Sequence, residues 1–178
     1  TITAATANAV MGSVGGTATV DYLQNVTLTA AANYGYHFVS WTAANGDVLG
    51  TTESITVQAL RDSVITANFD YNQYTVTVAT ATATMGGVSG TTTQNYLTEV
   101  QIAATPNYGY HFTQWNDGNT DNPRTVVVTA NATYTASFDY NQYTVSGVCD
   151  EVMGSVSGTQ TVNYLQNVTL TAMANYGY

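Results

Sequence analysis

The stretch Asp70-Tyr71-Asn72-Gln73-Tyr74-Thr75-Val76 recurs unchanged as Asp139-Tyr140-Asn141-Gln142-Tyr143-Thr144-Val145. The two copies start 69 positions apart, since 139 − 70 = 69. Three shorter motifs recur with them: Met-Gly at positions 11, 85 and 153, Tyr-Leu at 22, 96 and 164, and Asn-Tyr-Gly-Tyr at 33, 107 and 175. Repetition at this period is typical of an array of small modules. We therefore expect one repeat at 1–73, a second at 74–142 and an incomplete third at 143–178.

The first two repeats differ in the length of one loop. Trp41 lies 15 positions before Thr56, whereas Trp115 lies 10 positions before the matching Thr125 (56 − 41 and 125 − 115). The first repeat therefore carries five extra residues after its tryptophan.

The local pattern of each repeat is that of β-strands. Apolar and threonine residues alternate with a period of two in the runs 74–78, 26–30 and 100–103, and no segment has helical spacing over three turns. Threonine, tyrosine and valine dominate these runs and suit a pleated surface. In the second repeat we expect strands near 74–83, 97–105, 110–116, 124–130 and 133–139. The segments 85–90, 116–118 and 131–132 have the composition of turns. The predicted fold class is all-β.

A repeat of about 70 residues can bury only a modest core, so its recurring aromatic residues should supply much of it. The predicted core residues are Trp41, Trp115, Phe38, Phe112, Phe69 and Phe138. Only Asp-Tyr-Asn-Gln separates the last strand of one repeat from the first of the next. The tyrosines around these short links, which are Tyr71, Tyr74, Tyr140 and Tyr143, are predicted to pack one repeat on its neighbour. Such links favour a stiff rod over flexibly tethered modules.

Composition narrows the functional classes. Only 7% of the residues are charged, lysine is absent, and the formal net charge is −9. An acidic chain is repelled by nucleic-acid phosphates and by anionic lipid headgroups, so neither is an expected partner. No apolar run approaches the length of a membrane span, so we expect no membrane insertion. Cys149 is the only thiol, which excludes an intrachain disulfide.

Candidate catalytic and metal-binding residues are few. His37 and His111 occupy one repeat position in two separate repeats, so they do not suggest a shared metal site or a catalytic triad. The sequence therefore predicts no enzymatic activity and no cofactor. One loop, with Asn116, Asp117, Asn119 and Asp121, is rich in the oxygen ligands that Ca²⁺ prefers. The alternative interpretation of this loop is an Asp-Gly hairpin turn, which we favour because the first repeat lacks the same acidic spacing.

The complete pattern stands in the second repeat as four segments: Gly86-Gly87-Val88-Ser89-Gly90, Tyr96-Leu97-Thr98-Glu99-Val100-Gln101-Ile102-Ala103-Ala104, Tyr108-Gly109-Tyr110-His111-Phe112-Thr113-Gln114-Trp115, and Tyr134-Thr135-Ala136-Ser137-Phe138. It resembles the divergent internalin-type B-repeat family, which occurs in tandem on bacterial surface proteins. The resemblance implies β-grasp-like or small β-sandwich modules, an extracellular or cell-surface location, and no catalytic residues. The first repeat departs from the pattern after Trp41 and at 65–69.

Two functions remain open. The chain is expected to be a structural or adhesive array that forms a stalk, spacer or fibre. Its partners would then be neighbouring repeats or identical chains, which could also complete the third repeat if its end at Tyr178 is not a truncation. The alternative is an adhesin module that binds glycans or host surface proteins through exposed tyrosines. Tyrosines buried between repeats would support the first function, and rings lining an open groove would support the second.

Overall fold

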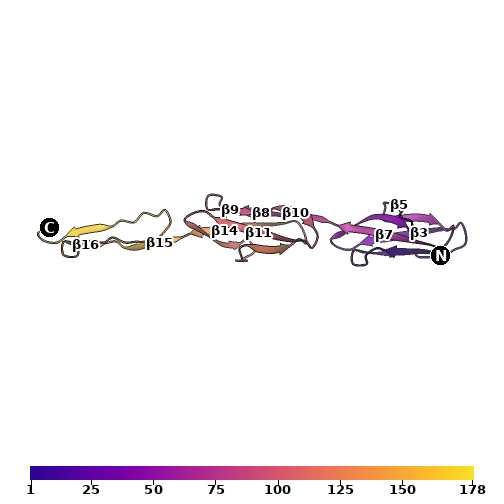
Figure 1. The fold of residues 1–178 in the computed structure, drawn as a ribbon, viewed down its shortest axis with the longest axis horizontal. Coiled ribbons are helices and arrows are strands. Elements are labelled where there is room, and N and C mark those ends of the chain that lie inside the picture. The colour runs from indigo at the N-terminus through magenta and orange to yellow at the C-terminus, as the bar shows by residue number, and fades with distance from the viewer. The chain divides into compact units, whose positions relative to one another are not determined.

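The computed structural model describes residues 1–178, and all of its regular elements are strands (Figure 1). The chain is therefore all-β, with several small sheets in tandem repeat-like modules. It contains no helix long and apolar enough to cross a membrane.

The first repeat forms two small sheets. Its strands are β1 (Ile2–Thr6), β2 (Gly12–Gly15), β3 (Asn25–Ala32), β4 (Tyr36–Ala43), β5 (Val48–Gly50), β6 (Ser54–Gln58) and β7 (Ser63–Tyr71). One sheet has the order β1-β7-β4-β5, with β1 parallel and β4 antiparallel to β7. The other has the antiparallel order β2-β3-β6. Strand β5 lies within the longer loop after Trp41.

Both sheets contribute to the core of the first repeat. Residues of β3 alternate between exposed and buried, and Val26, Leu28 and Ala30 point inward, as a strand with one buried face requires. The other buried members of this cluster are Ile2, Trp41, Ala59, Ile65 and Ala67. Phe38 and Phe69 are partly buried and pack against it. The core is therefore a sandwich of two sheets closed around one fully buried tryptophan.

The second repeat forms two sheets in a corresponding arrangement. Its strands are β8 (Gln73–Thr80), β9 (Gly86–Ser89), β10 (Thr92–Asn95), β11 (Glu99–Pro106), β12 (Tyr110–Trp115), β13 (Arg124–Val127) and β14 (Ala132–Tyr140). The sheet orders are β10-β8-β14-β12 and β13-β11-β9. Trp115 is fully buried, and its ring centroid lies 5.3 Å from that of Phe112. The Phe138 ring lies 6.2 Å from Phe112.

The expected turn at 85–90 is wrong, because Gly86–Ser89 forms strand β9 and pairs with β11. The glycines that suggested a turn have a packing role at this place. A Cβ on Gly86 would lie 2.5 Å from the Phe138 ring, so only glycine allows the ring to cover this strand. The expectation also overlooked strand β10, which is rich in threonine and asparagine.

The third, incomplete repeat consists of two short pairs. Strand β15 (Gln142–Val145) pairs with β17 (Gln160–Asn163), and β16 (Gly154–Ser157) pairs with β18 (Thr171–Ala174). None of the buried core residues lies beyond Ala136. Cys149, the one thiol, is exposed and free.

The chain divides into two compact units. The first contains Thr1–Thr75 together with two short segments of the second repeat, Thr93–Glu99 and Val127–Asn131. The second contains Val76–Thr92, Val100–Val126 and Ala132–Tyr178. The first repeat thus folds against residues that the sequence assigns to its neighbour.

Candidate functional site

A tyrosine from the second repeat lies on a glycine of the first. Gly35 is buried and has a φ of 87°, a left-handed conformation that glycine adopts without a steric penalty. A Cβ at this position would lie 2.2 Å from the ring of Tyr96. Because Gly35 has no side chain, the Tyr96 ring can lie directly against its backbone.

Four more tyrosines lie around the contact between Gly35 and Tyr96. We call the five rings of Tyr34, Tyr36, Tyr71, Tyr74 and Tyr96 the Tyr96 junction. The Tyr96 ring centroid lies 5.6 Å from Tyr34, 5.5 Å from Tyr36 and 6.3 Å from Tyr74, each in an edge-to-face arrangement. Tyr36 and Tyr71 lie 5.3 Å apart. Such pairs add about 0.5–1.5 kcal/mol each beyond the burial of their area.

Asn72 ties the backbone of the Tyr96 junction together. Its amide nitrogen donates to the Gly35 carbonyl at 2.9 Å, and its carbonyl accepts from the Tyr96 amide at 2.8 Å. Its side-chain nitrogen donates to the Tyr36 carbonyl at 3.2 Å, and its side-chain oxygen accepts from His37 Nδ1 at 3.1 Å. Asn72 thus hydrogen-bonds to residues of the first repeat and to Tyr96 of the second, and it holds the His37 ring in place.

The outermost ring is that of Tyr34, which remains 69% exposed. Its hydroxyl donates to the Thr129 carbonyl at 2.9 Å. Desolvation first, and then the neighbouring Tyr74 phenol, raises the pKa of the Tyr34 hydroxyl above its ordinary value. Tyr34 therefore stays a neutral hydrogen-bond donor across the physiological range.

The same arrangement recurs in the second compact unit, where Tyr108, Tyr110, Tyr140, Tyr143 and Tyr164 form the Tyr164 junction. The Tyr164 ring lies 5.6 Å from Tyr108, 5.5 Å from Tyr110 and 6.3 Å from Tyr143. It covers Gly109, where a Cβ would again lie 2.2 Å from the ring. Asn141 makes the corresponding four contacts, including one with His111 Nδ1 at 2.9 Å. Because the ring distances match in the two junctions, the arrangement is a recurring structural feature of the repeats and not a chance cluster of tyrosines.

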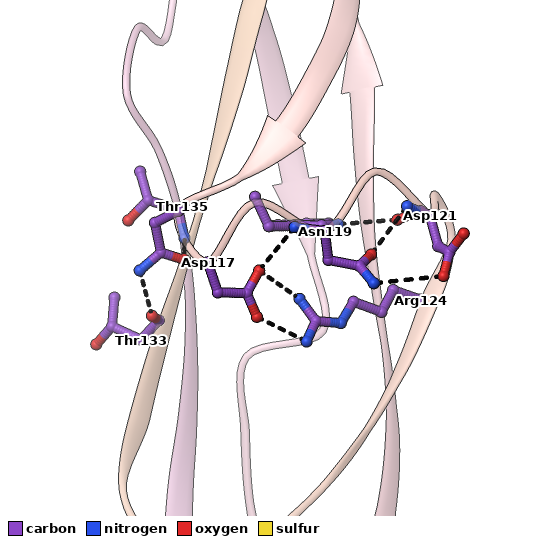
Figure 2. A network of polar contacts seen from close by, with 8 residues as sticks. Asp117, Asn119, Asp121, Arg124, Thr133 and Thr135 are labelled. Atoms are coloured by element: carbon purple, nitrogen blue, oxygen red, sulfur yellow. Dashed lines mark hydrogen bonds and ion pairs between the residues drawn. The ribbon is translucent and has the colours of Figure 1, made fainter.

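The loop that follows Trp115 is held by an ion pair (Figure 2). Arg124 Nη1 and Nη2 contact the two carboxylate oxygens of Asp117 at 2.8 and 2.7 Å. Asp117 also accepts from the Asn119 amide, and Asn119 accepts from the Asp121 amide at 2.9 Å. The Asn116 side chain donates to the Thr133 carbonyl and accepts from the Thr135 amide, both in strand β14.

The side-chain oxygens of this loop that could bind a calcium ion already accept hydrogen bonds from other protein groups. Both Asp117 oxygens face a guanidinium, and the Asn116 side-chain oxygen accepts from a backbone amide. The chain contains no group of three or more His, Cys, Asp or Glu residues placed to hold a metal ion. An ion bound here would have to displace Arg124, so the geometry favours the turn interpretation of this loop.

Comparison with protein families identifies the repeat. The model of the divergent InlB B-repeat domain matches residues 2–73 and again residues 74–142. The chain belongs to the divergent InlB B-repeat family. No curated protein and no solved structure matches it. The B-repeat family is associated with bacterial surface proteins.

The structure brings the predicted junction residues of these B-repeats together with residues that the sequence did not single out. Tyr71 and Tyr74 lie in the Tyr96 junction, and Tyr140 and Tyr143 lie in the Tyr164 junction. The Tyr-Gly-Tyr motifs at 34–36 and 108–110 belong to the junctions as well. The central ring was overlooked, although its Tyr-Leu motif recurs at 22, 96 and 164.

The ion pair in the second B-repeat should make that repeat sensitive to acid. Arg124 lowers the pKa of Asp117 by hydrogen bonding, so the pair stabilises the fold above the ordinary aspartate pKa and loses this effect as the pH falls through the lowered value. Because the Asp117 side chain is 41% exposed, solvent limits the gain to about 0.5–1 kcal/mol. We expect Asp117→Asn to be less stable than wild type at pH 7, with a difference that disappears once the pH falls below the lowered pKa of Asp117.

Urea unfolding at a series of pH values measures this difference. The matched control is Asp47→Asn, because Asp47 lies in the corresponding loop of the first repeat and pairs with Asn45 rather than with a cation. An Asp47→Asn variant with the same pH dependence as Asp117→Asn would contradict the assigned role of Arg124.

Proposed function

We propose that these B-repeats form a structural array, a stalk or spacer on a bacterial surface, in which the Tyr96 and Tyr164 junctions set the angle between neighbours. The observation that supports this role is the recurrence of one junction with the same ring spacings. The link between strands β7 and β8 is a single residue, Asn72. A ligand-binding surface does not require the same ring contacts around every such link. An extended array does require them, because each repeat must be held on its neighbour in the same way.

The proposed role is non-enzymatic. His37 and His111 lie in different repeats, and each donates a hydrogen bond from Nδ1 to the side-chain oxygen of an asparagine. Neither arrangement provides the base-and-nucleophile pair that hydrolytic catalysis requires. We also propose an extracellular location, in keeping with the association of the family with bacterial surface proteins.

A distance measurement between two spin labels tests the proposed stiffness. Labels at Thr56→Cys and Thr125→Cys occupy equivalent exposed strand positions, in a Cys149→Ser background that removes the native thiol. We expect a single narrow distance distribution for this protein. Tyr96→Ala should broaden this distance distribution at least about twofold, because it removes the ring that packs on Gly35.

The matched control is Tyr22→Ala, which removes the equivalent tyrosine of the first repeat. Tyr22 is 70% exposed and is in none of the ring contacts described above, so its loss should leave the distribution narrow. A distribution that is already broad in the parent protein would refute the stalk proposal.

The second candidate function is an adhesin that binds glycans or proteins through exposed tyrosines. One observation favours it: Tyr34 and Tyr108 remain 69% and 80% exposed at the edges of their junctions. Sugar rings stack on such exposed aromatic faces. A glycan array probed with the wild-type protein and with Tyr108→Ala would support this function only if a signal is present in the first and lost in the second.

A further inference from the structure

The first repeat contains a cavity that its longer loop helps to build. The cavity has a volume of about 660 Å³ and is lined by Ala43, Asn45 and Leu49 of that loop and by much of the segment 57–65. A volume of this size suits a small organic ligand. All of the lining residues belong to the first compact unit.

The corresponding positions of the second repeat carry different side chains. Ile65 corresponds to Tyr134 (134 − 65 = 69), and Ala43 corresponds to Asp117 (117 − 43 = 74). In the second repeat the Arg124 guanidinium lies 5.0 Å from the Tyr134 ring centroid and pairs with Asp117 (Figure 2). The first repeat has smaller side chains at 43 and 65, and its longer loop supplies Asn45 and Leu49 to the lining of the cavity.

The lining combines exposed aliphatic side chains with one cation, Arg61, and one carboxylate, Asp62. Leu49, Leu60 and Val64 are 45%, 58% and 50% exposed, so the cavity presents aliphatic surface that a ligand can cover. The Arg61 guanidinium makes no ion pair and no hydrogen bond. The adjacent Asp62 carboxylate contacts the Thr1 nitrogen instead.

Charge makes this arginine distinctive. The chain has a formal net charge of −9 and only two strong bases, and the other one, Arg124, is committed to Asp117. An anion is repelled by most of this molecule, and Arg61 is the one uncommitted base that could attract it. Because the guanidinium stands beside an apolar surface, the complementary ligand has an apolar body and a single negative group.

We propose that this cavity binds a small aromatic carboxylate. The ring packs against aliphatic side chains of the lining such as Leu49, and the carboxylate contacts Arg61. This site is specific to the first repeat, since the second repeat lacks the longer loop that supplies Asn45 and Leu49 to the lining. It is independent of the proposed array, which would stand even if the cavity bound nothing.

Methyl-resolved NMR of the whole chain tests the proposal, with 3-phenylpropionate as the probe. We expect saturable shifts of the Leu49, Leu60, Val64 and Ile65 methyl groups and none at Val126. The neutral analogue 3-phenylpropan-1-ol should bind at least about tenfold more weakly, as expected when a hydrogen-bonded charge is removed from the ligand. Absence of saturation up to the solubility limit of the probe, or shifts centred elsewhere, would overturn the proposal.

Two variants separate the parts of the site. Arg61→Gln should weaken binding of the acid by about tenfold without changing the weak binding of the alcohol. Leu49→Asp places a negative charge in an exposed loop, where it should not disturb the core, and should abolish binding of the acid. If either variant binds 3-phenylpropionate as tightly as the wild type, the assignment of this cavity is wrong.

Discussion

Replacing Trp115 by alanine should cost the second repeat about 3–5 kcal/mol of its free energy of unfolding, the range for large-to-small substitutions of buried aromatic residues. Trp115 is fully buried, and its ring centroid lies 5.3 Å from that of Phe112. Domain stabilities of about 0.05–0.15 kcal/mol per residue give a repeat of about 70 residues about 3.5–10 kcal/mol, so the loss removes about a third of it or more. We therefore expect the unfolding transition of the second repeat to move to a much lower urea concentration, measured by urea titration.

A milder pair of variants shows whether the effect comes from packing or from the indole nitrogen. Trp115 Nε1 donates to the Asp121 carbonyl at 2.9 Å, whereas Trp41 Nε1 is buried without a protein acceptor. Trp115→Phe leaves that carbonyl without its donor, so it should cost about 1 kcal/mol more than Trp41→Phe. Equal costs for the two phenylalanine variants would mean that the Asp121 contact contributes nothing to stability.

The elements that sequence analysis locates well are those with local signals. Alternation of period two marks β3 and β11, because one face of each strand is buried and the other is solvated. The recurring tryptophans are recognisable as core residues from their size and their place inside strands. Nothing beyond the neighbouring sequence is needed for these inferences.

The start of β11 shows where local signals fail. The strand expected from residue 97 begins at Glu99, because Leu97 has a φ of 67° and turns the chain. Leu23 and Leu165 adopt the same conformation with φ of 68°. Leucine rarely occupies this left-handed region, so propensity gives no indication of the turn. The Leu97 amide donates to the Val128 carbonyl at 2.7 Å, a contact with a distant segment that helps to hold the turn in place.

The junction could not be predicted for a related reason. Its central contact joins Gly35 to Tyr96, residues 61 positions apart (96 − 35), and neither has a neighbour in sequence that points to the other. Similarly, the sequence shows the oxygens of the loop at 116–121, but it does not show that Arg124 pairs with Asp117. Repetition shows which residues recur, while the contacts they make depend on tertiary structure.

Replacing Gly35 by alanine should destabilise the first compact unit through two separable effects. The first is the backbone cost of a left-handed conformation for a residue with a side chain, about 1–2 kcal/mol. The second is displacement of the Tyr96 ring, since the new Cβ would lie 2.2 Å from it, and overpacking of this kind costs about 1–3 kcal/mol. Urea unfolding gives the sum, and near-ultraviolet circular dichroism reports the disturbed tyrosines.

Gly46→Ala isolates the first effect, because Gly46 has a φ of 90° and no atom lies within 4 Å of the position of its Cβ. If the Tyr96 junction stabilises the unit, Gly35→Ala must lose more stability than Gly46→Ala, and only Gly35→Ala should change the tyrosine signal. Gly109→Ala should repeat the result in the second unit, where the Tyr164 ring covers the glycine at the same distance. Equal losses for Gly35→Ala and Gly46→Ala, with an unchanged tyrosine signal, would show that backbone strain alone is responsible and that the ring contributes no packing energy at the junction.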